Sequence, residues 1–480
     1  MQNAYSSSMR AALTLVAATA LAGCSFTPKY ERPAAPVAAT FPDQAAPVAA
    51  PADNIAWREF VGNARLRDLI ALALTNNRDL RVATLNIEQV RAQYQIRRAD
   101  QFPAIGLAAA GNRQPDANGG TANTYSVGLA LSSWEIDFFG RLGSLKEAAL
   151  AQYLATEEAR DAAQTSLVAS VASTWLSLQA NDELLAVTEL TVATRQDSLR
   201  LSKLRFDNGA TSALDLRQAE SLTAAAQSAL AQQRRLRALD LNALTLLVGQ
   251  TPPAALLPSP PTMPQATTAN GVSVPVAPVP AAAMLRDVPA GLPSDLLTRR
   301  PDIRQAEQQL IAANANIGAA RAAFFPRISL TASAGSVSSS LLGLFESGSW
   351  GFTLAPQALL PIFDAGRNNA NLESAKAARD IAVAQYEKAI QVAFREVADA
   401  LAGSATLGDQ LTAQQVQATA EAERFRLAEL RYRNGVASFL DVLDAQRSLF
   451  TTQQALAQTR LAQQQNQVAL YKALGGGWTE

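Results

Sequence analysis

The sequence predicts a mixed α/β membrane protein made of two structural repeats. Three observations support this prediction: a long internal repeat, helical patterns far longer than a globular core requires, and four short segments with strand alternation. Each repeat is expected to supply two strands and a set of long helices.

Composition excludes most catalytic chemistry. The 480 residues include no histidine and one cysteine, and 41 basic residues balance 41 acidic ones. A Ser-His-Asp triad, a Cys-His pair, a His or Cys zinc site and a disulfide are therefore all excluded. We predict no enzyme, no metal and no cofactor, and the zero net charge argues against nucleic acid as a partner.

The amino terminus resembles a bacterial lipoprotein signal. Arg10 precedes an apolar run that ends in Leu21-Ala22-Gly23-Cys24, and this run is too short to cross a membrane as a helix. The resemblance implies cleavage after residue 23 and acylation of Cys24. We expect 1–23 to be a signal peptide and the proline-rich 24–63 to be a lipidated tether. No later stretch has the length and apolarity of a membrane helix, so any span is expected to be β.

The internal repeat has a nearly constant offset. Three features recur 226 residues apart: Gly140-Arg141 with Gly366-Arg367, Asn208-Gly209 with Asn434-Gly435, and Gly249 with Gly475. The sequence therefore predicts a first repeat over 64–250 and a second over 292–480, joined by a proline-rich linker over 251–291.

Each repeat contains helices of unusual length. In the first copy we expect helices over 77–100, over 144–206 and over 215–248. The middle helix has roughly 60 residues and would reach roughly 90 Å at 1.5 Å per residue. A 3-4 spacing of Val168, Val171 and Trp175 is typical of a coiled-coil seam.

Four segments alternate between apolar and small or weakly polar residues. They lie near 103–113 and 124–134 in the first copy and near 326–336 and 350–360 in the second. Each has about the 9–11 residues of a tilted membrane strand, although a half-buried strand of a soluble sandwich remains an alternative. Pro356 is expected to cause a bulge or a strand end.

Four strands cannot close into a barrel alone, and open edges in hydrocarbon leave backbone groups unpaired at several kcal/mol each. The chain must therefore form oligomers. Two copies would give about eight strands and a filled interior, and three would give about twelve strands and an open lumen.

Several motifs resemble those of the TolC-like outer membrane factors, in particular the lipoprotein branch of OprM and NodT type. They are WEIDFFGR at 134–141, PIFDAGR at 361–367, RYRNG at 431–435, LDVLDAQR at 440–447 and YKALGGGW at 471–478. The resemblance implies a homotrimer with a twelve-stranded outer-membrane barrel, four strands per chain, continuous with a long α-helical coiled-coil tunnel in the periplasm. It also implies docking to a periplasmic adaptor and an inner-membrane pump of the resistance-nodulation-division (RND) type.

Two sets of site residues follow. Asp441 and Asp444 lie three apart on one helix face with Arg447 beyond them, and we expect the three to form a periplasmic pore constriction. Ser438-x-x-Asp441 also fits a helix-capping box, which would explain Asp441 without a pore. In the family, turns such as those at Gly209 and Gly435 contact the adaptor, although a turn alone also requires glycine there.

The function expected from the resemblance is passive exit of drugs or other toxic small molecules through an RND-type efflux system. A channel for type I protein secretion and a lipid-anchored periplasmic coiled-coil adaptor remain alternatives. A carboxylate-dependent hydrolase has no cleft signature. The transported substrates cannot be read from the sequence.

Overall fold

The computed structural model describes residues 26–41, 55–115, 119–259, 265–267, 273–275, 284–288 and 300–477. The chain divides into two compact units. Unit 1 draws on Met1–Ala35, Thr84–Ala159 and Asp302–Ala389, and unit 2 on Pro36–Ala83, Arg160–Pro301 and Ile390–Glu480. Each unit therefore combines parts of both sequence repeats.

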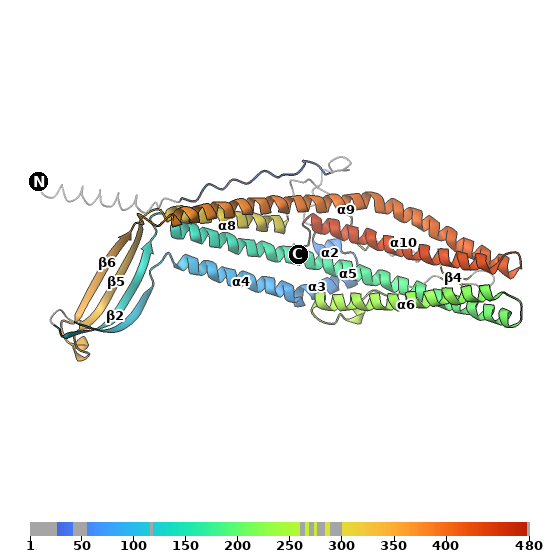
Figure 1. The fold of residues 1–480 in the computed structure, drawn as a ribbon, viewed down its shortest axis with the longest axis horizontal. Helices are drawn as coiled ribbons and strands as arrows, with labels where there is room; N and C mark the ends of the chain where they lie inside the picture. Colours follow the sequence, from blue (N-terminus) through green and yellow to red (C-terminus); the bar gives the residue numbers. More distant parts are fainter. Residues whose placement is uncertain are drawn as a thin grey trace. The chain divides into compact units, whose positions relative to one another are not determined.

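Unit 1 contains an antiparallel sheet of four strands in the order β1-β2-β5-β6. The strands are β1 (Ile105–Pro115), β2 (Thr121–Ile136), β5 (Arg327–Ser338) and β6 (Trp350–Leu359). Figure 1 shows β2, β5 and β6 side by side. These strands lie within a few residues of the four predicted segments.

The two faces of this sheet differ as the alternation predicts. In register, Leu107 lies opposite Leu129, which lies opposite Ala334, which lies opposite Phe352. Leu107, Leu129 and Phe352 are all exposed within one chain. The neighbouring register row is Ala108, Gly128, Gly335 and Gly351, so the other face carries small residues. One face is therefore apolar and the other has little side-chain bulk.

The sheet contains one bulge, and it is not at Pro356. The register of β2 against β5 shifts between Leu131 and Trp134, where Ser133 has a φ of 45°. Pro356 pairs with Leu330 in an unbroken register, so the prediction of a bulge or strand end at Pro356 is wrong. Strand β6 pairs continuously from Trp350 to Leu359, so the proline is accommodated without an inserted residue.

The helices repeat in length between the two copies. The first copy contains α4 (Arg78–Ala99, 22 residues), α5 (Arg141–Asp207, 67 residues) and α6 (Ala213–Val248, 36 residues). The second contains α8 (Pro301–Ala322, 22 residues), α9 (Arg367–Arg433, 67 residues) and α10 (Phe439–Ala473, 35 residues). The long helices are slightly longer than predicted. Among the described residues, no helix combines the length and apolarity needed to cross a membrane.

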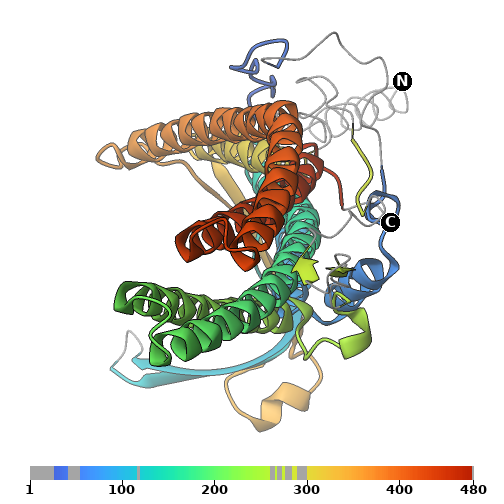
Figure 2. The ribbon, with the colours of Figure 1, turned by 90° about the vertical axis from the view of Figure 1, so that its right-hand side faces the viewer.

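In unit 2 the helices form two hairpins, α5 with α6 and α9 with α10, which Figure 2 shows from the side of their turns. The core of this unit includes the predicted seam residues Val168, Val171 and Trp175, all buried. It also includes α3 (Ala64–Asn76), which sequence periodicity did not identify. The hairpins are thus packed on one side by a short helix.

Part of the stretch predicted as a tether also enters this core. Trp57 and Phe60 of α2 (Trp57–Phe60) are 1% exposed, and the Phe60 ring stacks on Tyr471 with centroids 4.0 Å apart. The Tyr471 hydroxyl donates a hydrogen bond to the Ile55 carbonyl at 2.7 Å. Residues 55–60 and Tyr471, which are far apart in the sequence, therefore pack together in the core of unit 2.

Strands β2 and β5 approach most closely at the paired glycines Gly128 and Gly335. A Cβ at Gly335 would lie 2.2 Å from the Val127 carbonyl oxygen and 2.5 Å from the Gly128 Cα. We expect Gly335→Ala to force the strands apart and to lower stability by about 1–3 kcal/mol, the usual cost of overpacking. Thermal unfolding of the purified protein measures this loss.

The matched control is Gly351→Ala, in the same register row, where a Cβ would meet no atom within 4 Å. Equal unfolding temperatures for the two variants would contradict the close approach of β2 and β5.

Candidate channel constriction and helical turns

Asp441 caps the start of α10. The Ser438 hydroxyl accepts a hydrogen bond from the Asp441 backbone N–H at 3.3 Å, and the Asp441 carboxylate accepts one from the Ser438 N–H at 3.1 Å. Ser212 and Asp215 form the same capping box at the start of α6. Because both copies use the pair in the same way, helix capping is sufficient to explain Asp441.

Asp444 links α9 to α10. Its carboxylate accepts a hydrogen bond from Arg424 of α9 at 2.5 Å and another from Arg447, one turn further along α10. Arg424 also pairs with Glu421 at 3.2 Å. The Arg424 guanidinium holds the pKa of the Asp444 carboxyl below its usual range, with a further contribution from Arg447 against the opposing effect of partial burial. A charged bridge therefore fastens this hairpin.

Arg424 is a site residue that the sequence analysis missed. A signal for it exists, because the internal repeat places Ser198 at the position of Arg424, Gln218 at that of Asp444 and Ser221 at that of Arg447. The first copy thus lacks all three charges of the bridge. Comparing the two copies position by position would have identified Arg424 together with its partners.

The two turns predicted to contact the adaptor, at Gly209 and Gly435, are both helix ends of the Schellman type. Gly209 has a φ of 70° and its N–H bonds to the Phe206 carbonyl, while the Ala210 N–H bonds to the Arg205 carbonyl. Gly435, with a φ of 73°, repeats this pattern with Tyr432 and Arg431. A Cβ at either glycine would meet no atom within 4 Å, so the turn requires glycine for its backbone conformation and not for space.

The two hairpins contact each other next to these turns. The Arg205 guanidinium lies 4.9 Å from the centre of the Tyr432 ring and bonds to its hydroxyl, and the Tyr432 ring lies 5.1 Å from that of Phe439. Leu204, Leu214, Val436 and Leu440 are exposed in the same region. The turns therefore carry exposed apolar side chains beside an ordered aromatic contact.

Cys24, the predicted lipidation site, lies outside the described residues. The chain beyond it is fixed to unit 1, where Phe26 stacks on Phe325 with ring centroids 4.6 Å apart. Glu307 of α8 accepts hydrogen bonds from Tyr30 at 2.9 Å and from Arg32 at 2.7 and 2.8 Å. The first described residues are thus held along α8.

The residues that the structure describes include no group of three or more His, Cys, Asp or Glu side chains able to hold a metal ion.

Comparison with known proteins assigns the family. The family model described as outer membrane efflux protein matches residues 69–250 and 292–476, which fall within the two predicted repeats. The chain is 47% identical over 479 residues to the toluene efflux pump outer membrane protein TtgC of Pseudomonas putida, covering 97% of this chain and 95% of that protein. It is 45% identical over 475 residues to the outer membrane protein OprJ of Pseudomonas aeruginosa, with coverage of 97% and 95%.

A solved structure resembles the chain over nearly its whole length. The open state of the MtrE outer membrane channel of Neisseria gonorrhoeae aligns with a TM-score of 0.83 and 38% sequence identity, covering 95% of this chain and 99% of that one. The matching repeats, the four strands per chain and the long paired helices agree with these relatives, and the chain belongs to the outer membrane efflux protein family.

Proposed function

We propose that the chain is the outer-membrane channel of an RND-type tripartite efflux system, through which drugs or other toxic small molecules leave the cell passively. The observation that carries this proposal is the four-stranded sheet with an apolar face and two unpaired edges, joined in one chain to two 67-residue helices. A relative named for toluene efflux favours small molecules over secreted proteins as cargo.

Closure of the sheet supports a homotrimer. Within the chain, β1 and β6 are edge strands with one partner each. Three chains of four strands give twelve strands, enough for a lumen lined by the small-residue face. Leu107, Leu129 and Phe352 form an exposed apolar face on the sheet. A barrel wall in lipid explains this face, whereas a coiled-coil adaptor does not. The lipid-anchored adaptor alternative is therefore weaker.

Mass measurement and electrical recording test this function together. The detergent-extracted protein is expected to have three times the mass of one mature chain and to conduct ions in a planar bilayer. A single-chain mass without conductance would contradict the proposal.

Co-purification with an ABC-type exporter alone would instead favour the protein-secretion alternative. Mass spectrometry of the mature amino terminus tests acylation of Cys24, which the lipoprotein-like signal supports.

The proposed periplasmic constriction consists of Asp441, Asp444 and Arg447. Arg424 is added to it, because it bridges α9 to Asp444 of α10. The Asp444 carboxylate pairs with the Arg424 and Arg447 guanidinium groups, and Glu421 pairs with Arg424. Threefold symmetry would repeat these charges around the axis. Exposed ion pairs are weak, so docking of an adaptor can rearrange them at low cost.

Removing Asp444 is expected to loosen this constriction. In Asp444→Ala, both Arg424 and Arg447 lose their shared partner, and each chain loses one negative charge at this position. We expect higher single-channel conductance and loss of cation preference, with a larger effect when Asp441→Ala is added. Planar-bilayer recording with reversal potentials in a salt gradient measures both quantities.

Gln218→Ala is the matched control, because Gln218 occupies the position of Asp444 in the first copy. Unchanged conductance in Asp444→Ala would contradict a constriction at this bridge.

The turns at Gly209 and Gly435 are the proposed adaptor-contacting tips. Asparagine tolerates positive φ, so Gly209→Asn and Gly435→Asn are expected to keep the fold while placing a polar side chain at each contact. We expect adaptor affinity to fall by about tenfold or more, equivalent to ~1.4 kcal/mol. Surface plasmon resonance with the purified adaptor measures it.

Gly366→Asn is the matched control, because Gly366 also has positive φ and open space but lies in unit 1. An equal loss of affinity in all three variants would show that the tips have no special role.

A further inference from the structure

Arg195 of α5 is a buried cation without a carboxylate partner among the described residues. It is 4% exposed, and one of its terminal nitrogens donates a hydrogen bond to the Leu222 carbonyl oxygen of α6 at 2.8 Å. Its Nε has no hydrogen-bond partner in the part of the chain that the structure describes. A buried charge of this kind is costly unless a counter-charge is present.

The charged neighbour of Arg195 makes this cost larger. Burial lowers the pKa of Arg195, and the positive charge of Arg447 lowers it further. The repeat places Glu421 at the position of Arg195 in the second copy, where Glu421 pairs with Arg424. The second copy therefore pairs this position with an opposite charge, whereas the described neighbours of Arg195 in the first copy give it a contact with the Phe450 ring, 5.4 Å from the ring centre, and no carboxylate.

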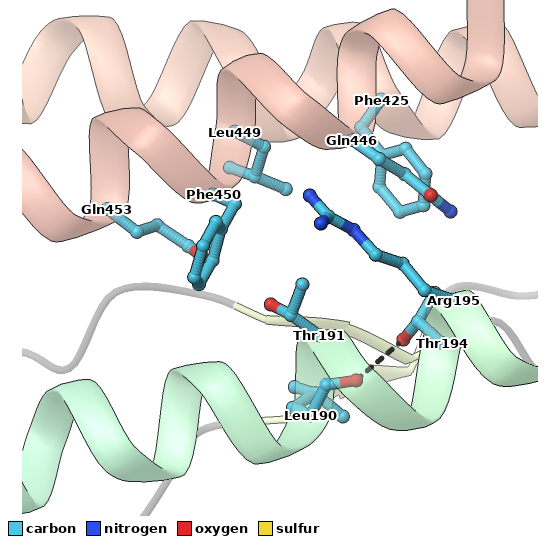
Figure 3. A pocket seen from close by; sticks show the side chains of 9 residues that line it. All are labelled: Leu190, Thr191, Thr194, Arg195, Phe425, Gln446, Leu449, Phe450 and Gln453. Carbon is cyan, nitrogen blue, oxygen red and sulfur yellow. Dashed lines mark hydrogen bonds between the residues drawn. The ribbon is translucent and has the colours of Figure 1, made fainter. Parts of the chain in front are cut away.

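A small cavity lies beside the Arg195 side chain, between α5 and α10. Its volume is ≈ 30 Å³, and its lining includes Arg195, Gln446, Phe450 and Gln453. Figure 3 shows the guanidinium group reaching from α5 toward α10, close to Leu449 and Gln446. A cavity of this size holds one or two water-sized groups.

Arg195 is the one charged residue among the described residues that line the cavity. No carboxylate lines it, and Gln446 and Gln453 are 8% and 6% exposed. The Gln446 side-chain oxygen has no hydrogen-bond partner, so nothing described fixes its amide against a rotation that would turn the NH2 group inward. The Thr191 and Thr194 hydroxyls donate to carbonyl oxygens of their own helix at 2.8 and 3.0 Å.

We propose that this cavity binds one small monovalent anion, chloride in physiological salt, between the Arg195 guanidinium and the Gln446 amide. The small volume fits a monatomic ion better than a large polyatomic anion. The ion supplies the missing counter-charge and holds α5 against α10. This inference goes beyond the proposed function, since it concerns how the hairpins pack and not what the channel carries.

Anion exchange in the full-length protein tests the proposal. At equal ionic strength, the unfolding temperature is expected to be higher in sodium chloride than in sodium gluconate by about 2 °C or more, because gluconate is much bulkier than chloride and fits the small cavity less well. Arg195→Gln is expected to abolish this difference. Arg200→Gln, which removes an exposed arginine of the same helix, is the matched control and should retain it.

A second measurement avoids dependence on any variant. Crystals of the unaltered protein soaked in sodium bromide are expected to give an anomalous peak beside Arg195 and Gln446. Water in the cavity without a bromide peak, or equal unfolding temperatures in the two salts, would overturn the proposal. Neither result would affect the channel function, which conductance tests independently.

Discussion

The unpaired edges of the four-stranded sheet are the constraint on which the other features depend. Strands β1 and β6 each hydrogen bond to one neighbour within the chain, so the backbone on their outer sides needs partners elsewhere. In hydrocarbon, water cannot supply those partners, and other copies of the chain must do so. The apolar face of the sheet then faces lipid, and the face of small residues faces the lumen.

Internal duplication explains the regularity of the helices. Both long helices have 67 residues, both end in Schellman turns, and both following helices begin with a Ser-x-x-Asp capping box. These features depend on local backbone chemistry and are the same in both copies. The charged residues differ: Arg424, Asp444 and Arg447 replace Ser198, Gln218 and Ser221, while Arg195 stands where the second copy has Glu421. The two copies thus share the same helices, turns and caps, and their different charged residues distinguish one hairpin from the other.

The two charge arrangements have opposite consequences for the hairpins. The bridge of Asp444 with Arg424 and Arg447 is partly exposed, so it can rearrange without much desolvation. Arg195 is buried between α5 and α10, and a bound anion would strengthen that contact by supplying a counter-charge. An anion beside Arg195 would also reduce the electrostatic repulsion between Arg195 and Arg447.

Several parts of the structure depend on contacts that periodicity cannot reveal. Arg424 reaches Asp444 from another helix, and Arg205 reaches Tyr432 from the other hairpin. Trp57 and Phe60 lie in a proline-rich region that reads as a tether, yet they pack beside Tyr471 near the opposite end of the sequence. The bulge between Leu131 and Trp134 depends on the register with β5, and Pro356 is accommodated within an unbroken register of β5 with β6.

The sequence by itself determined the duplicated plan, the strands, the long helices and their glycine turns, because hydrophobic period and turn chemistry act over a few residues. It also indicated that one chain is incomplete, since four strands cannot close. Only the tertiary structure decided which charges meet, which side chains fill the core of unit 2 and where a cation is left without a partner. Those outcomes depend on the rotation and register of elements distant in the sequence, which no local pattern specifies.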